Sequence, residues 1–292
     1  MKAAIYSRVM EDEQRKDIQL FFDELANQKI NPVIFQPFFE EIKNKINLPS
    51  NTTTFSISED LTQEIEFIVS LGGDGTLLDT ITLVRDKKIS IMGINFGRLG
   101  FLASIGRDEV QKAVKAMSQR TYVVDRRTLI HLDASISMFG DVPYALNDFS
   151  IHKRDVAAMI KIHTYLNGEF LNTYWADGLI VATPTGSTGY SLSCNGPVVF
   201  PDSGSFVITP VAPHNLNVRP IIVPDSNIIS FEIESRTDQI ICALDSRREV
   251  VSKDVQLAIK KERFDINLVR LSENNFLQTL RNKLTWGLDK RN

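Results

Sequence analysis

Cysteine is scarce in this sequence. The 292 residues include two cysteines, Cys194 and Cys242, which lie far apart and form no pair with the spacing of metal ligands. The four histidines show no such spacing either. These absences argue against a disulfide framework and a structural zinc site, and they are typical of a reduced, cytoplasmic setting. We therefore predict no metal-ligating residues.

The sequence also lacks an excess of basic charge and any long apolar run. Lys and Arg number 33 and Asp and Glu 36, so the formal net charge is −3. This balance argues against nucleic-acid binding through general basicity. The first apolar stretch is too short for a signal peptide, and no run reaches the length of a membrane span. We expect a soluble cytoplasmic protein with no nucleic-acid or membrane partner.

Apolar runs and amphipathic segments alternate along the first 120 residues. Strands that alternate with helices indicate an α/β domain with a doubly wound, Rossmann-like parallel sheet, which we place at 1–120. The polar segment 51–54 is predicted to be a loop. Strands are predicted at 3–7, 32–35, 67–71 and 89–95, and helices at 12–27, 38–46 and 107–120.

The pattern changes to period-two alternation near Thr121. Segments 159–166 and 170–175 flank Asn167-Gly168, which predicts a hairpin, and short strands punctuated by prolines follow. We predict an all-β, β-sandwich-like domain at 121–270. Apolar residues at helical spacing in 274–288 predict a final helix, and residues 271–292 are expected to pack back on the α/β domain.

A glycine-rich loop follows the third predicted strand. Residues 72–75 read Gly-Gly-Asp-Gly, and Thr76 opens a helical spacing. A strand, a glycine turn and a helix can point successive backbone N–H groups at an anion such as a phosphate. Anion binding alone does not explain the carboxylate of Asp74, which we interpret as a base or a metal ligand. The alternative is a tight β-hairpin, because Asp-Gly is a strong hairpin signal.

A second stretch, residues 176–193, is rich in glycine and hydroxyl groups and contains one aromatic residue, Tyr190. Hydroxyls and backbone amides suit ribose and carboxamide groups, and an aromatic ring can stack on a base. The alternative is a Ser/Thr-rich surface loop. Asn147-Asp148 is a candidate ribose clamp, although such pairs are also common in turns. Trp175 is a candidate stacking platform or an ordinary core residue.

Four motifs in order resemble the NAD kinase family. They are Gly72-Gly-Asp-Gly-Thr76, Asn95-Phe-Gly-Arg-Leu-Gly-Phe101, Asn147-Asp148, and Asp177-Gly178 followed by Thr183-Pro-Thr-Gly-Ser-Thr-Gly-Tyr190. The first motif is shared with diacylglycerol- and sphingosine-type lipid kinases and approached by phosphofructokinases, whereas the motif ending at Tyr190 is much more specific. The similarity extends over nearly the whole chain, including 210–213 and the final helix.

The resemblance implies phosphorylation of the 2′-hydroxyl of the adenosine ribose of NAD, with ATP as donor and a divalent metal, Mg²⁺. By position, Asp74 would be the general base, beside Gly75. The cleft between the domains is the expected site. Family positions that would contact the dinucleotide are Asn147 and Asp148 (ribose and adenine edge), Asp177 (nicotinamide end), Thr188, Gly189, Tyr190, Ser191, Leu192 and Ser193 (adenosine), and Ala212, Trp175 and Arg247.

The chain departs from the family pattern at four of these positions. The family usually has Ala where this chain has Gly189 and Glu where it has Asp148, whose shorter carboxylate must reach further to a ribose. Many members carry a basic residue where Trp175 stands, and some carry Gln in place of Arg247. The resemblance also implies a homodimer or homotetramer. The competing hypotheses are a lipid kinase of the same architecture and a non-catalytic NAD(P)-binding sensor.

Overall fold

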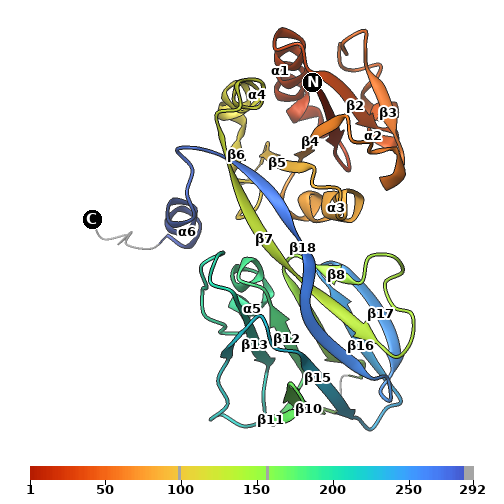
Figure 1. Cartoon of the computed structure of the whole chain (residues 1–292), viewed down its shortest axis with the longest axis vertical. Helices are drawn as coiled ribbons and strands as arrows, with labels where there is room; N and C mark the ends of the chain where they lie inside the picture. The colour runs from red at the N-terminus through yellow and green to blue at the C-terminus, as the bar shows by residue number, and fades with distance from the viewer. Residues whose placement is uncertain (98–99, 156–157, 286–292) are drawn as a thin grey trace. The chain divides into compact units, whose positions relative to one another are not determined.

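The computed structural model describes residues 1–97, 100–155 and 158–285. The chain divides into two compact units. Unit 1 comprises Met1–Arg126 and Ile266–Asn292, and unit 2 comprises Arg127–Asp265. Two strands, β7 (Tyr122–Ala134) and β18 (Leu257–Leu271), cross from one unit into the other, as Figure 1 shows. None of the described helices is long and apolar enough to cross a membrane.

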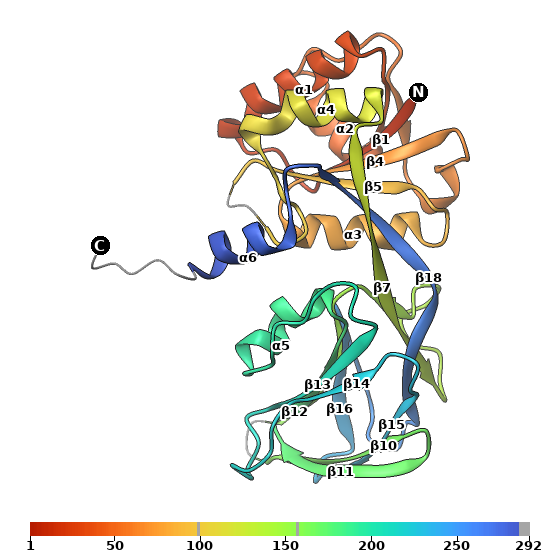
Figure 2. The ribbon, with the colours of Figure 1, turned by 60° about the vertical axis from the view of Figure 1, so that its left-hand side comes forward.

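Unit 1 is built on a parallel sheet with the strand order β18-β5-β4-β1-β2-β3. Figure 2 shows helices α1 and α4 over one face of this sheet and α3 over the other, so the sheet is doubly wound as predicted. The strands are β1 (Lys2–Tyr6), β2 (Asn31–Phe35), β3 (Thr53–Phe55), β4 (Ile65–Leu71), β5 (Ser90–Asn95) and β6 (Ile105–Gly106). The helices are α1 (Arg15–Asn27), α2 (Gln36–Ile42), α3 (Asp74–Val84), α4 (Val110–Gln119) and α6 (Phe276–Leu284).

The core of unit 1 explains why its strands lack polar alternation. Phe67 and Val69 of β4 join the cluster that contains Phe21 and Phe22 of α1, while Ile68 between them is also fully buried. A strand covered by helices on both faces buries every side chain, and such a strand appears in the sequence as a continuous apolar run.

One secondary-structure prediction in unit 1 is wrong. Residues 51–54 were expected to form a loop, but β3 begins at Thr53 and pairs in parallel with β2. Only Phe55 of this edge strand is buried, so its threonines carry no apolar signal, although β-branched threonine favours strands.

Unit 2 contains two antiparallel sheets whose inner faces share one core, as in a β-sandwich. One sheet has the order β14-β13-β12-β9-β16-β17, and the other contains β11-β10-β15-β18. The predicted hairpin joins β10 to β11, with both Asn167 and Gly168 at positive φ. The remaining strands are β8 (Tyr144–Ala145), β9 (Asp148–Lys153), β10 (Ile160–Leu166), β11 (Glu169–Ala176), β12 (Gly178–Ala182), β13 (Ser205–Val211), β14 (Ile221–Pro224), β15 (Ile229–Glu234), β16 (Gln239–Leu244) and β17 (Arg247–Ser252).

The final helix, α6, belongs to unit 1. The side chain of Asn275 caps its N-terminus by accepting a hydrogen bond from the N–H of Gln278. The helix was predicted to reach residue 288, but residues 286–288 lie outside the part of the chain that the structure describes.

Candidate active site

The glycine-rich loop of unit 1 joins the end of β4 to the start of α3. Gly72 has φ of +149°, and a Cβ there would lie 2.5 Å from Thr76 Oγ1, so the turn requires glycine. The helix then begins at Asp74. The predicted strand–turn–helix is therefore confirmed, and the hairpin alternative is wrong.

The Asp74 carboxylate is held by the segment that follows β5. It accepts hydrogen bonds from the N–H groups of Phe101 (2.9 Å), Leu102 (3.1 Å) and Ala103 (2.9 Å). A Cβ on Gly100 would lie 1.8 Å from Asp74 Oδ1, so only glycine permits this approach. The structure thus brings the first two motifs of the sequence together, although Arg98 and Leu99 lie outside the described residues.

Arg8 lies beside the first turn of α3. Because β1 pairs in parallel with β4, residues after β1 emerge at the same sheet edge as the glycine loop. The Arg8 guanidinium donates to the carbonyl of Gly75 (3.2 Å) and to both carboxylate oxygens of Asp79 (2.5 and 2.8 Å). Tyr6 also donates to Asp79, and burial together with this carboxylate raises the pKa of Tyr6 to about 12. Sequence reasoning did not select Arg8.

Asn147 and Asp148 stand at the start of β9 in unit 2. Asp148 is 7% exposed and Asn147 is half-buried. Neither side chain forms a hydrogen bond with another described residue, although their backbone groups are bound. Burial, followed by the nearby charge of Asp245, raises the pKa of Asp148 to about 7.

The hydroxyl-rich stretch after β12 is buried from Thr183 to Ser187 and partly exposed from Thr188 to Ser193. It forms a 3₁₀ helix at Thr185–Thr188 and a short helix, α5, at Tyr190–Ser193. The buried Ser191 and Thr209 hydroxyls are 2.8 Å apart, and Thr183 Oγ1 donates to the carbonyl of Leu146. A Cβ on Gly186 would lie 2.0 Å from the carbonyl oxygen of Asn147. The turn therefore packs directly against the Asn147–Asp148 backbone.

Asp177 lies at the opposite end of the same strands, and Tyr190 is within electrostatic reach of both Asp177 and Asp148. Asp177 precedes β12 and forms an ion pair of 2.5 Å with Lys153 at the end of β9. The Tyr190 ring lies 5.8 Å from the His152 ring, and burial lowers the pKa of His152. Five strand residues separate the two ends, which is about 15 Å. The two ends therefore define an extended polar surface in unit 2.

The rest of the predicted binding residues have varied surroundings. Thr188 Oγ1 donates to the carbonyl of Thr185, and Leu192 is half-buried, whereas Gly189 and Ser193 are exposed. Ala212 is exposed and has φ of +45°, a strained conformation for alanine.

Arg247 lies on β17 and is engaged with backbone groups. Its guanidinium donates to the carbonyls of Val142 (2.6 Å) and Tyr144 (2.5 Å). Burial lowers its pKa, while the nearby Asp245 acts in the opposite direction. These contacts give Arg247 a role in holding the chain before β9.

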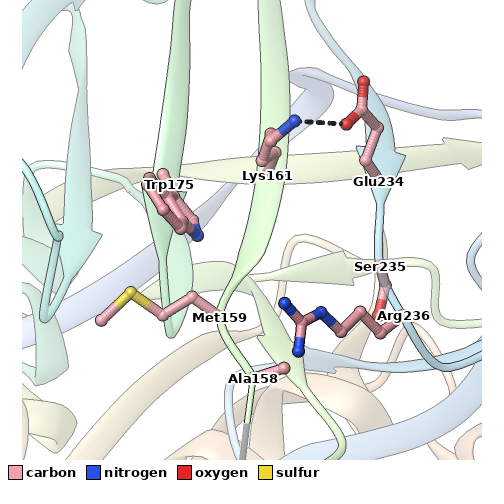
Figure 3. Close-up of a pocket in the computed structure, with 7 residues that line it drawn as sticks. All are labelled: Ala158, Met159, Lys161, Trp175, Glu234, Ser235 and Arg236. Atoms are coloured by element: carbon pink, nitrogen blue, oxygen red, sulfur yellow. Dashed lines mark hydrogen bonds and ion pairs between the residues drawn. The ribbon is translucent and has the colours of Figure 1, made fainter.

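Trp175 lies on β11, away from this surface. Its ring stacks on His214 at 4.3 Å and is 48% exposed. Figure 3 shows it at a cavity of about 550 Å³ on the sheet of β10, β11 and β15, with Met159, Lys161 and Arg236. Lys161 is paired with Glu234 there. No hydrogen bond or ring contact between described residues joins Trp175 to Tyr190 or Asn147.

Asp245 is a half-buried residue of this region that sequence reasoning missed. Its carboxylate accepts hydrogen bonds from the N–H groups of Leu146 (2.9 Å), Asn147 (2.7 Å) and Asp148 (3.3 Å). In the sequence it appears only as the first residue of the two-residue turn between β16 and β17. A polar residue in a short hairpin turn is common, so the sequence carried no signal for these contacts.

The described residues contain no group of three or more His, Cys, Asp or Glu side chains that could hold a metal ion. Asp74 is the carboxylate nearest the loop, and its oxygens already accept three N–H groups. Mg²⁺ commonly takes only one or two protein carboxylates and completes its shell with substrate phosphates and water. The donor set therefore fits a metal that arrives with a nucleotide triphosphate.

A strand–glycine turn–helix in one unit and a hydroxyl-rich, carboxylate-bearing surface in the other define a nucleotide-dependent phosphotransferase. Residues 8–122 match the ATP-NAD kinase N-terminal domain, and residues 146–271 match the ATP-NAD kinase C-terminal domain. The chain therefore belongs to the NAD kinase family, as the motifs predicted.

Two relatives extend the match over the full chain. An NAD kinase of Cytophaga hutchinsonii is 48% identical over 290 residues, which are 99% of each chain. An NAD kinase of Bacteroides fragilis is 38% identical over 291 residues, which are 100% of each chain.

Two solved structures share the fold. Yeast NADH kinase complexed with NADH has a TM-score of 0.89 at 22% identity and covers 99% of this chain and 88% of its own. An NAD kinase from Archaeoglobus fulgidus in complex with ATP has a TM-score of 0.76 at 26% identity. The match covers 98% of this chain and 99% of the other. The α/β plus β-sandwich architecture predicted from the sequence is thus confirmed.

Proposed function

We propose that the chain transfers the terminal phosphoryl group of ATP to the 2′-hydroxyl of the adenosine ribose of NAD, with Asp74 as the general base. ATP-dependent phosphorylation of NAD is the activity of the family to which the chain belongs. The observation that carries the assignment is the presence, in one chain, of the Asp74 loop and of the polar surface around Asn147 and Asp148.

Asp74 has the chemistry that this reaction needs. The 2′-oxygen bonds to the terminal phosphorus as the bond from phosphorus to the ADP oxygen breaks, and the hydroxyl proton passes to the carboxylate. The three N–H groups after β5 fix the direction of that carboxylate and thus where a proton can be accepted. A sensor that only bound NAD would not need an acid at this position.

The surface in unit 2 has the chemistry to bind a dinucleotide. The side chains of Asn147 and Asp148 form no hydrogen bond with other described residues, and they can bind ribose hydroxyls and the adenine edge. Tyr190, with its exposed ring, can stack on adenine, and Asp177 at the far end can accept from the nicotinamide carboxamide. An extended polar surface suits NAD better than the apolar acyl chain of a lipid.

Charge on the transferred phosphoryl group must be neutralised in the transition state. Arg8 is the cation held closest to the glycine loop among the described contacts, through Gly75 and Asp79. Mg²⁺ bound to the ATP phosphates would supply the remaining neutralisation. The family resemblance further supports a cytoplasmic homodimer or homotetramer.

An assay with purified protein, Mg-ATP and one acceptor at a time tests the proposal. NAD should yield NADP at the expense of ATP, and omission of the metal should abolish turnover. Phosphorylation of diacylglycerol instead of NAD would contradict the proposal. A rise in melting temperature with NAD but no turnover with any triphosphate would indicate the sensor. The same assay with NADH measures the preference for the reduced acceptor.

A further inference from the structure

The backbone of Leu146–Asp148 is fixed by two residues distant from it in sequence. Asp245 accepts from all three N–H groups, and its own N–H donates to the carbonyl of Asp148 (3.0 Å). Thr183 supplies the other contacts: its hydroxyl donates to the carbonyl of Leu146 and its N–H to that of Asn147 (2.8 Å). Every backbone polar group of the three residues therefore has a partner.

The side chains on this backbone show the opposite pattern. Neither Asn147 nor Asp148 uses its side chain in a hydrogen bond with another described residue, and Asp148 is nonetheless buried. Buried polar groups in native proteins almost always have partners, so these two side chains are suited to a ligand. A fixed backbone with free side chains is the arrangement expected of a pre-organised binding site.

Asp245 has an uncommon backbone conformation and an enclosed carboxylate. It is half-buried, and its backbone has φ of +51°, a region that favours glycine, asparagine and aspartate. A buried carboxylate is costly unless several donors surround it. Three N–H groups supply this compensation, and Arg247 adds a favourable charge.

We propose that Asp245 is a positioning residue for dinucleotide binding, which fixes the backbone of Leu146–Asp148 and thereby directs the side chains of Asn147 and Asp148 at the ribose and adenine of NAD. This inference rests on the proposed function. Asp245 touches no reacting atom in this assignment, and its effect is transmitted through the clamp that it holds.

Asp245 also acts electrostatically on Asp148, whose N–H donates a hydrogen bond to it. Burial raises the pKa of both carboxyls, and the nearby charge of Asp245 raises that of Asp148 further, while the three N–H donors and Arg247 act on the pKa of Asp245 in the opposite direction. The other titratable groups within electrostatic reach of Asp148 are Tyr190 of α5 and Cys194, which follows this helix. The ionised Asp148 accepts hydrogen bonds from ribose hydroxyls, so NAD should bind more tightly as pH rises through about 7.

Asp245→Asn and Asp245→Gly test the inference, because both residues tolerate positive φ. We expect folded proteins whose KM for NAD rises at least tenfold, while kcat and the KM for ATP change less than threefold. In Asp245→Asn the pH midpoint for NAD binding should also fall, because Asp148 loses its like-charged neighbour. Asp225→Asn is the control, since Asp225 is a mostly buried carboxylate of the same unit that pairs with Lys261 (2.7 Å).

Folded Asp245 variants with an unchanged KM for NAD and an unchanged pH midpoint would overturn the inference and leave the proposed function intact. If neither variant folds, Asp245 serves the fold rather than the clamp, which also overturns it. A wild-type protein that neither binds nor phosphorylates NAD would instead overturn the proposed function itself.

Discussion

The carboxylate of Asp74 accepts a hydrogen bond of 2.9 Å from the N–H of Ala103, 29 residues away in the sequence. This contact joins the start of α3 to the segment after β5, and the N–H groups of Phe101 and Leu102 complete it. A general base has to be held in one direction, and these three donors would hold Asp74 so in its proposed role.

Asp74→Asn should therefore lower kcat by a factor of about 10²–10⁴, the usual contribution of a general base. The fold and the dissociation constant for NAD should stay close to wild type, as measured by circular dichroism and calorimetric titration. Asp60→Asn is the matched control, because Asp60 in the same unit also accepts backbone N–H groups, those of Ser56 and Ile57. Retention of most activity in Asp74→Asn would show that another group takes the proton.

Arg8→Ala should raise the KM for ATP by about tenfold, or about 1.4 kcal/mol of lost phosphate binding. The KM for NAD should not change. Arg120→Ala removes an equally exposed guanidinium, paired with Glu66 near the other end of β4, and should leave both constants unaltered. An equal effect of the two variants on the KM for ATP would mean that only net charge matters.

Much of the fold could be predicted because local patterns and tertiary burial agree. The runs that became β4 and β5 are apolar on both faces, and the hairpin at Asn167-Gly168 uses the residues that its turn requires. Strand β3 was missed because its side chains are exposed at the sheet edge. Its formation depends on backbone pairing with β2, which leaves no apolar pattern.

The candidate residues that the sequence selects stand in short motifs, whereas contacts between residues distant in the sequence could not be predicted. Asp74 is marked by the glycines around it. Asp245 acts on residues about 98 positions away, and nothing in its own neighbourhood indicates that contact. Arg8 likewise reaches its partner Asp79 only through the parallel pairing of β1 with β4.

Asp148 should make stability depend on pH. Its pKa rises from 3.8 to about 7 on folding, so between these values the folded state binds more protons than the unfolded state. Stability from this group is therefore greatest below about pH 4 and falls as pH rises to about 7. Asp148→Asn should flatten this slope and stabilise the protein at pH 8 by on the order of 2–4 kcal/mol.

Urea unfolding of wild type and Asp148→Asn at pH 5 and pH 8 measures that difference. Asp225→Asn provides the comparison, since it also neutralises a mostly buried carboxylate of unit 2 but breaks an ion pair with Lys261. The same pH slope in wild type and Asp148→Asn would mean that Asp148 is ionised in the folded protein throughout this range.

Gly186→Ala should disturb the Asn147–Asp148 clamp, because Gly186 packs against the backbone of Asn147. A Cβ at this position would lie 2.0 Å from the carbonyl oxygen of Asn147, and backbone on both sides leaves no flexible side chain to move aside. We expect a loss of about 1–3 kcal/mol of stability, as for other overpacked sites, together with a raised KM for NAD.

Gly189→Ala, three residues later in the same turn, is the control. Its Cβ would meet only the carbonyl of Gly186 at 3.3 Å, so stability and KM should stay near wild type. Equal behaviour of the two variants in melting and kinetic assays would show that the turn yields without disturbing Asn147.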